Sequence, residues 1–152
     1  DYCECKMIDT IAREPLWRHL INYRCGTGHS VSFVGNVHEG PHALNSRNTT
    51  RMRPGMVVTD EPGVYETDLV GIRIENELVC VHKADNQYGT FLGFEPLMFV
   101  PIATSPILPG VLDKDEIAWL NDYHRQVFAK LAPHLNDEER SWLADKCAAI
   151  GC

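Results

Sequence analysis

The sequence predicts an α+β fold in which an antiparallel sheet is flanked by helices. Three features predict it: apolar residues near helical spacing early in the chain, short β-rich runs in its middle, and two amphipathic helical segments at its end. The 152 residues, 44% hydrophobic and 23% charged, are enough for one compact core. We therefore expect residues 1–152 to form a single domain.

The first quarter of the chain is predicted to form a helix and a long loop. Residues 9–23 carry apolar side chains near helical spacing, and Pro15 favours a kink or restart within this helix. Glycine, asparagine, serine and histidine are frequent from residue 25 to 53, which indicates a loop with a short strand at Val31–Val34. Long ordered loops in compact domains are often functional.

The middle of the chain, residues 56–102, is predicted to form several antiparallel strands. Turn residues separate the runs MVVTD, GIRIENELVCV, TFLGF and LMFVPI. In residues 72–75 the alternation sends Ile72 and Ile74 to one face of a strand and Arg73 and Glu75 to the other. The presence of two charged side chains on one strand face has to be explained.

Two helices are predicted to end the chain. Residues 113–116, DKDE, supply an acidic first turn. An apolar stripe follows, formed by Ile117, Leu120, Tyr123, Val127 and Leu131. The second helix is expected from Asp137 to Ala149.

Charge and composition exclude some classes of protein. Fourteen basic and twenty-one acidic residues give a net charge of −7, with no basic cluster for nucleic acid. No run approaches the roughly 18 apolar residues of a membrane span, and the first ten residues lack the features of a signal peptide. We expect a soluble, cytoplasmic protein without nucleic-acid or membrane partners. The six cysteines lack zinc-module spacing and are interpreted as free thiols.

Four residues attract attention as a set: His29, His38, Glu61 and Glu75. Each has a simpler interpretation. A histidine in a glycine-rich loop often only forms hydrogen bonds, Glu61 precedes a Pro-Gly turn, and Glu75 can form an ion pair with Arg73. Taken together, the four residues are less easily dismissed as structural than each one alone.

Six segments, in this order, resemble the C-terminal catalytic part of aminopeptidase P, a family of pita-bread metallopeptidases. They are GTGH (26–29), NVHEGP (36–41), PGMVVTDEPGVYE (54–66), GIRIEN (71–76), FEPL (94–97) and WLNDYHRQV (119–127). The resemblance extends from about Ile8 to the C-terminus. It implies the C-terminal half of a pita-bread fold.

The resemblance also implies a chemistry. The family removes an N-terminal residue that precedes proline, using two divalent metals, usually Mn with Zn or Co as alternatives. His29, Glu61 and Glu75 match the metal ligands, and Glu61 also matches the catalytic proton acceptor. His38 matches a histidine that contacts the substrate and moves protons, and Arg73 matches a residue that orients the carboxylates.

The match to the family is incomplete. Two aspartate ligands of the five implied have no counterpart here, and Ser30 and Ser32 stand where the family has glycines. We therefore expect the C-terminal part of a longer catalytic domain, with the preceding half absent. Such a chain alone would lack the second metal and would be inactive. By the same resemblance, the complete parent is expected to form a homodimer through its tail helices.

Two alternatives stay open. One is a non-catalytic pita-bread module that keeps only a binding surface. The other is a mononuclear hydrolase that uses His29, Glu61 and Glu75 as its three ligands. Four other histidines are interpreted as surface or structural residues: His42, His82, His124 and His134.

Overall fold

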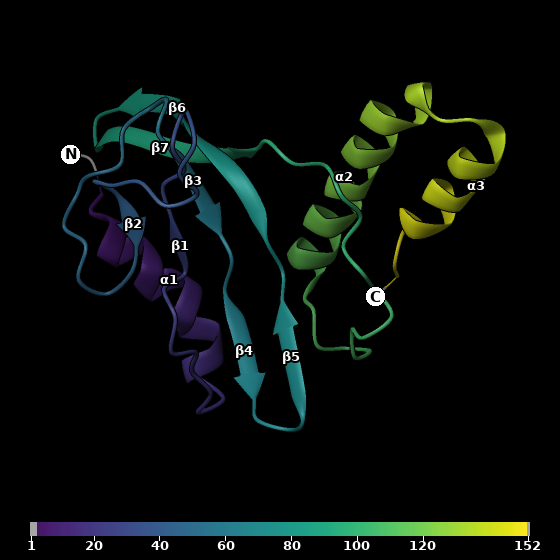
Figure 1. The fold of residues 1–152 in the computed structure, drawn as a ribbon, viewed down its shortest axis with the longest axis horizontal. Helices are drawn as coiled ribbons and strands as arrows, with labels where there is room; N and C mark the ends of the chain where they lie inside the picture. Colours follow the sequence, from purple (N-terminus) through teal and green to yellow (C-terminus); the bar gives the residue numbers. More distant parts are fainter. Residues whose placement is uncertain (1–2, 152) are drawn as a thin grey trace. The chain divides into compact units, whose positions relative to one another are not determined.

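A computed structural model describes residues 3–151. The chain divides into two compact units, Asp1–Met98 (unit 1) and Phe99–Cys152 (unit 2), shown in Figure 1. Helices and antiparallel sheets are both present, which confirms the predicted α+β class. The expectation that residues 1–152 form one domain, part of a longer one, stays a prediction.

Unit 1 consists of one helix and seven strands. They are α1 (Cys5–Trp17), β1 (Gly28–His29), β2 (Ala43–Leu44), β3 (Val57–Asp60), β4 (Gly63–Glu66), β5 (Val70–Arg73), β6 (Asn76–Asn86) and β7 (Gly89–Pro96). All pairings are antiparallel: β3-β6-β7 form one sheet, and β1-β2 and β4-β5 form separate pairs. Figure 1 shows α1 beside β1 and β2.

The core of unit 1 joins α1 to the sheets. Its buried members are Cys5, Leu44, Met52, Val58 and Cys80. Each comes from a different segment, so burial of their apolar surface holds the helix, the loop and the sheet together. The strands that carry the candidate site residues are therefore anchored at one end by this core.

Helix α1 corrects the expected range 9–23. It begins four residues earlier, because the N–H groups of Cys5 and Lys6 donate to the carbonyl oxygens of Thr50 and Asn48 at 2.9 and 3.0 Å. These acceptors satisfy N–H groups that a helix leaves free at its start. The helix contains Pro15 and ends at Trp17 without restarting. Leu20, with a φ of 60°, turns the chain away.

Two further strand predictions are wrong. The strand expected at Val31–Val34 is absent, and the short strand lies at Gly28–His29, paired with Ala43–Leu44. Residues 31–34 form a turn in which the Ser32 hydroxyl donates to the Val34 carbonyl at 2.9 Å. The run 97–102 is irregular, because Phe99 and Ile102 pack into the core of unit 2.

Unit 2 consists of α2 (Lys114–Leu131), the short 3-10 helix η1 (Ala132–His134) and α3 (Asp137–Lys146). Both long helices begin with a capping box, Asp113 with Glu116 and Asn136 with Glu139. The predicted α2 is confirmed, and α3 ends three residues before Ala149. The core contains Tyr123, Val127, Ala132 and Leu143.

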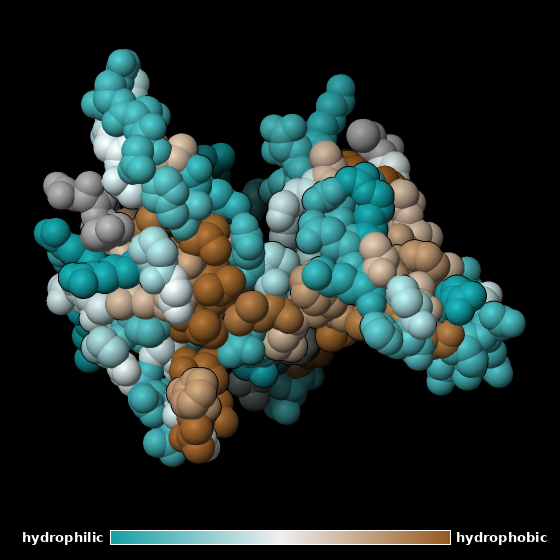
Figure 2. Space-filling view, turned by 90° about the horizontal axis from the view of Figure 1, so that it is seen from above, coloured by the Kyte–Doolittle hydropathy of each residue, from teal (hydrophilic) through white to brown (hydrophobic). Residues whose placement is uncertain are grey.

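Many apolar side chains remain on the surface. Figure 2 shows hydrophobic side chains between hydrophilic ones on one face of unit 1. Ile72 and Ile74, predicted to share a strand face, are 56% and 55% exposed. Within residues 3–151, no helix has the length and apolar character needed to cross a membrane. Five cysteines, all except the terminal one, are described, and each is a free thiol.

Candidate metal centre

His29 owes its place to a close approach of two backbones. At Gly28, an added Cβ would lie 1.8 Å from the Thr59 carbonyl oxygen, so only glycine fits. The approach lets the His29 N–H donate to the Thr59 hydroxyl oxygen at 3.0 Å. Strand β1 therefore presents the His29 side chain beside the end of β3.

Glu61 follows directly after β3 and lies against His29. Its N–H donates to the Thr27 carbonyl at 2.7 Å. Its Oε1 atom accepts a hydrogen bond from the Thr59 hydroxyl at 3.0 Å and lies 3.0 Å from Nε2 of His29. Both side chains are mostly buried, with 19% and 17% exposed for His29 and Glu61.

The hydrogen bonds of His29 define its tautomer. Nδ1 lies 3.1 Å from the carbonyl oxygen of Ser30, which can only accept, so Nδ1 carries a proton. In the neutral ring, Nε2 then directs a lone pair at the Glu61 carboxylate. Two acceptors at this distance repel unless a cation or a second proton lies with them.

Arg73 connects the two predicted carboxylate ligands. Its Nη1 atom lies 3.1 Å from Oε2 of Glu61, and its Nε atom lies 3.4 Å from Oε2 of Glu75. Strand β5 ends at Arg73, yet Arg73 and Glu75 still point the same way, as the alternation predicted. One guanidinium therefore orients both carboxylates, and Glu75 joins the cluster through Arg73.

His38 meets His29 through its ring. The two ring centroids are 4.0 Å apart at an interplanar angle of 52°. The loop of His38 is held by the N–H of Glu39, which donates to the Ser30 carbonyl at 3.2 Å. His38 is exposed, which leaves its ring accessible to a substrate. The nearby hydroxyl of Ser30 is buried without a hydrogen-bond partner among residues 3–151.

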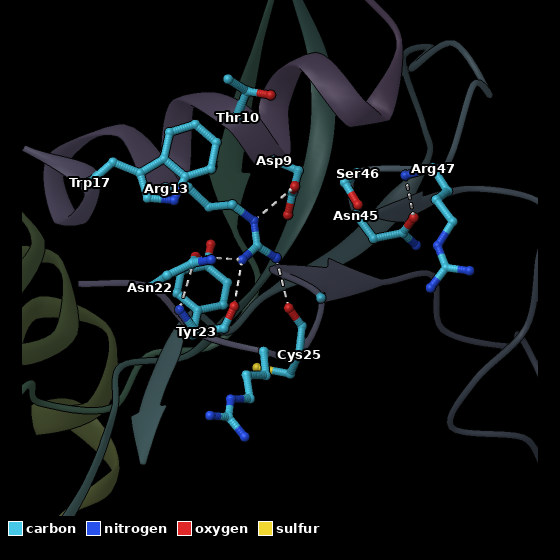
Figure 3. A pocket seen from close by; sticks show the side chains of 12 residues that line it. Asp9, Thr10, Arg13, Trp17, Asn22, Tyr23, Cys25, Asn45, Ser46 and Arg47 are labelled. Carbon is cyan, nitrogen blue, oxygen red and sulfur yellow. Dashed lines mark hydrogen bonds and ion pairs between the residues drawn. The ribbon is translucent and has the colours of Figure 1, made fainter. Parts of the chain in front are cut away.

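Sequence reasoning missed several residues that support this cluster. Thr59 bridges the backbone of His29 and the carboxylate of Glu61. Residues two positions apart in extended chain point to the same side, so the spacing of Thr59 and Glu61 could have predicted that their side chains meet. A second set, Asp9, Arg13 and Thr27, connects α1 to the same loop and is drawn in part in Figure 3. No local sequence pattern predicted this set.

The donor set fits part of a metal site. His29 Nε2 and Glu61 Oε1 offer an imidazole nitrogen and a carboxylate oxygen, both common ligands of Mn, Zn and Co. Across residues 3–151, no three His, Cys, Asp or Glu side chains are grouped to hold an ion. Two converging donors are fewer than the three protein ligands of a catalytic zinc site. The ligand roles of His29, Glu61 and Glu75 stay predictions.

Comparisons with known proteins place the chain in a family. Residues 3–82 match the model of metallopeptidase family M24, and residues 90–150 match the model of the C-terminal region of peptidase M24. The first match covers more than half of the chain. The chain belongs to metallopeptidase family M24.

Similar proteins within this family are aminopeptidases P. The chain is 42% identical over 152 residues to a probable Xaa-Pro aminopeptidase P of Coprinopsis cinerea, covering 95% of this chain and 24% of the relative. It is 44% identical over 144 residues to aminopeptidase P2 of Arabidopsis thaliana, covering 90% and 20%. The resemblance stated from the motifs is confirmed. The chain spans between a fifth and a quarter of these relatives.

A solved structure supports the fold. X-prolyl aminopeptidase from Caenorhabditis elegans, described as a cytosolic enzyme with a di-nuclear active site, matches with a TM-score of 0.90 and 38% identity. The match covers 99% of this chain and 25% of that one. The predicted partial pita-bread fold is therefore confirmed.

Proposed function

We propose that this chain is the C-terminal part of the catalytic domain of an Xaa-Pro aminopeptidase, which removes an N-terminal residue that precedes proline. The observation that carries the proposal is the 3.0 Å approach of His29 Nε2 to Glu61 Oε1, with His38 beside His29. Membership of family M24 and the names of the similar proteins support it.

In this proposal, His29, Glu61 and Glu75 bind two divalent metals together with ligands from outside residues 1–152. We infer Mn²⁺, with Zn²⁺ or Co²⁺ as alternatives, because an imidazole and carboxylates suit these ions better than thiolate-binding metals. When bound, such a pair lowers the pKa of water and polarises the scissile carbonyl. With only two converging donors, residues 3–151 by themselves should bind metal weakly and be inactive.

The residues of this chain have separate tasks in the reaction. Glu61 would accept a proton from the attacking water; its carboxylate lies 3.0 Å from the imidazole of His29. His38 hydrogen-bonds the substrate and passes a proton to the departing proline nitrogen from its exposed position. Arg73 orients the Glu61 and Glu75 carboxylates, since its guanidinium lies 3.1 Å from one and 3.4 Å from the other.

The substrates in this proposal are peptides with proline at the second position. The bond before proline lacks an N–H, which denies ordinary peptidases the extended pairing that they use. We further propose that the complete protein is cytoplasmic and forms a homodimer. The net charge of −7 over residues 1–152 disfavours nucleic acid as a partner of this chain.

A test uses the complete gene product and an Xaa-Pro peptide in the presence of Mn²⁺. We expect the wild type to release the first residue and His29→Ala to lose this activity. His82→Ala is the control and should retain the activity, because His82 lies at an exposed position of β6, where it pairs with Asp85 at 2.8 Å. Residues 1–152 alone should show no turnover. Turnover by this chain that depends on His29 would favour the mononuclear alternative.

Metal content separates the enzyme from the non-catalytic alternative. The complete protein should bind close to two Mn²⁺ ions by calorimetry. A complete protein that binds no divalent metal and still binds proline-containing peptides would instead be a binding module, and the proposed aminopeptidase activity would be rejected.

A further inference from the structure

Thr27 is the point at which helix α1 meets the segment that carries His29. Its side chain is fully buried, and its hydroxyl lies 2.6 Å from Oδ1 of Asp9 and 2.5 Å from the Tyr23 hydroxyl. An ionised Asp9 can only accept, so the Thr27 hydroxyl donates to Asp9 and accepts from Tyr23. The Thr27 hydroxyl therefore both donates and accepts a hydrogen bond inside the protein.

Asp9 and Arg13 form a buried ion pair on α1. Asp9 is 1% and Arg13 8% exposed, and Nε of Arg13 donates to Oδ2 of Asp9 at 2.9 Å. Burial disfavours the charged guanidinium, but the hydrogen bond and charge of Asp9 outweigh it and raise the pKa of Arg13. Breaking a buried pair of this kind is costly, because the remaining partner is left unpaired inside the protein.

The rest of the Arg13 guanidinium ties the same loop to α1. Its Nη1 and Nη2 atoms donate to the backbone carbonyls of Tyr23 and Cys25, each at 2.7 Å. Figure 3 shows these bonds fanning out from one side chain toward the loop, in the wall of a cavity of about 750 Å³. The rigid fork of arginine therefore fixes the backbone just before Thr27.

Backbone hydrogen bonds of Thr27 link the buried ion pair of α1 to the segments of the candidate metal ligands. Its N–H donates to the Leu44 carbonyl, and its C=O accepts from the N–H of Glu61, both at 2.7 Å. His29 follows two residues later in the same segment. One residue thus connects the buried ion pair of α1 to Glu61 by a single further hydrogen bond.

We propose that Asp9, Arg13 and Thr27 are positioning residues that hold Glu61 and His29 at the separation required to bind the same ion. Among residues 3–151, no side-chain hydrogen bond or ion pair joins any of the three to His29 or Glu61, so the effect acts through the Thr27 backbone. The inference rests on the proposed function, because it assumes that His29 and Glu61 are metal ligands. Partners that orient ligands in this way typically contribute about 10–100-fold to metal affinity or activity.

The test replaces Thr27 by valine in the complete protein, which keeps the shape and removes the hydroxyl. We expect the Kd for Mn²⁺, measured by calorimetry, to rise about 10–100-fold. The kcat should fall more than KM rises, since chemistry rather than substrate binding is disturbed. Without metal, the amide of Glu61 should exchange its hydrogen faster in NMR. Thr27→Ser, which keeps the hydroxyl, should stay within about threefold of wild type in Kd.

A matched control separates positioning from general stability. Met52→Ala removes a side chain that is 1% exposed in the core of unit 1 and should lower the melting temperature. It should leave the Kd for Mn²⁺ nearly unchanged. A loss of affinity in Met52→Ala equal to that in Thr27→Val would overturn the inference. If Thr27→Val does not fold, Tyr23→Phe removes the hydroxyl that donates to Thr27 and should weaken Mn²⁺ binding several-fold.

The outcomes also separate the two proposals. A wild type that binds no Mn²⁺ overturns the proposed function and this inference with it. A wild type that binds Mn²⁺ while Thr27→Val, or Tyr23→Phe in its place, binds as tightly overturns the inference alone.

Discussion

The hydroxyl of Thr59 donates a hydrogen bond to Oε1 of Glu61 at 3.0 Å and accepts one from the backbone N–H of His29, also at 3.0 Å. One side chain of β3 thus joins two residues that lie 32 positions apart in the sequence. Oε1 is also the oxygen that faces the His29 ring. Thr59 therefore orients the Glu61 carboxylate so that Oε1 faces His29.

Replacing Thr59 by valine tests this role. Valine has the same shape but leaves the Glu61 carboxylate and the His29 N–H without their shared partner. We expect the complete protein to lose about tenfold or more in Mn²⁺ affinity. Thr59→Ser, which retains the hydroxyl, serves as the control. Equal calorimetric affinities for the valine and serine variants would show that the bridge is dispensable.

Gly28→Ala should destabilise the protein. The added methyl group would meet the Thr59 carbonyl at 1.8 Å, and backbone cannot move aside as a flexible side chain can. We expect a loss of about 1–3 kcal/mol in the free energy of unfolding, measured by urea titration. Gly40→Ala is the control, because an added Cβ there has no neighbour within 4 Å. The prediction fails if both variants unfold at the same urea concentration.

Arg73→Lys should separate charge from geometry. Lysine keeps the positive charge but lacks the planar fork that reaches Glu61 and Glu75 at 3.1 and 3.4 Å. We expect kcat/KM for an Xaa-Pro peptide to fall about 10–100-fold. Arg125→Lys, on the exposed surface of α2, is the control and should leave kcat/KM unchanged. Full activity in Arg73→Lys would mean that charge alone suffices.

His124 should make stability depend on pH. The side chain is fully buried, and its Nε2 atom accepts the N–H of Ile102 at 3.1 Å. Burial lowers its pKa below the ordinary value of 6.5. Below this value the unfolded chain binds a proton that the folded protein resists, so stability is complete above about pH 6.5 and declines as pH falls.

The measurement compares wild type with His124→Gln, which retains an acceptor and does not titrate. Between pH 7.5 and 5, we expect the free energy of unfolding to fall more steeply in wild type. The exposed His19, replaced by glutamine, provides the control and should follow the wild-type slope. Parallel slopes for wild type and His124→Gln would contradict the prediction.

Local signals predicted the parts of the fold that depend on local physics. The start of α2 followed from the acidic turn at Asp113, because a helix cap involves residues within one turn. The alternation at Arg73 and Glu75 correctly placed the two side chains on the same side, where they lie 3.4 Å apart. The candidate site itself came from family motifs, since no periodicity relates His29 to Glu61.

Long-range contacts account for what the sequence did not predict. Helix α1 begins at Cys5 because carbonyls at Thr50 and Asn48 receive its first N–H groups. The apolar residues Phe99 and Ile102 were predicted to lie in a strand, but they pack against the core of unit 2. The roles of Thr27 and Thr59 depend on partners distant in sequence, which a local pattern cannot contain.

Thr27 has a consequence for which substitutions the protein can tolerate. Its N–H, its C=O and its hydroxyl bind three different segments, and its side chain has no exposed surface. Only serine offers the same three groups at a similar size. In a mutational scan, position 27 should therefore accept serine and reject most other residues. A position with no side-chain contact to His29 or Glu61 would then look as restricted as a catalytic one.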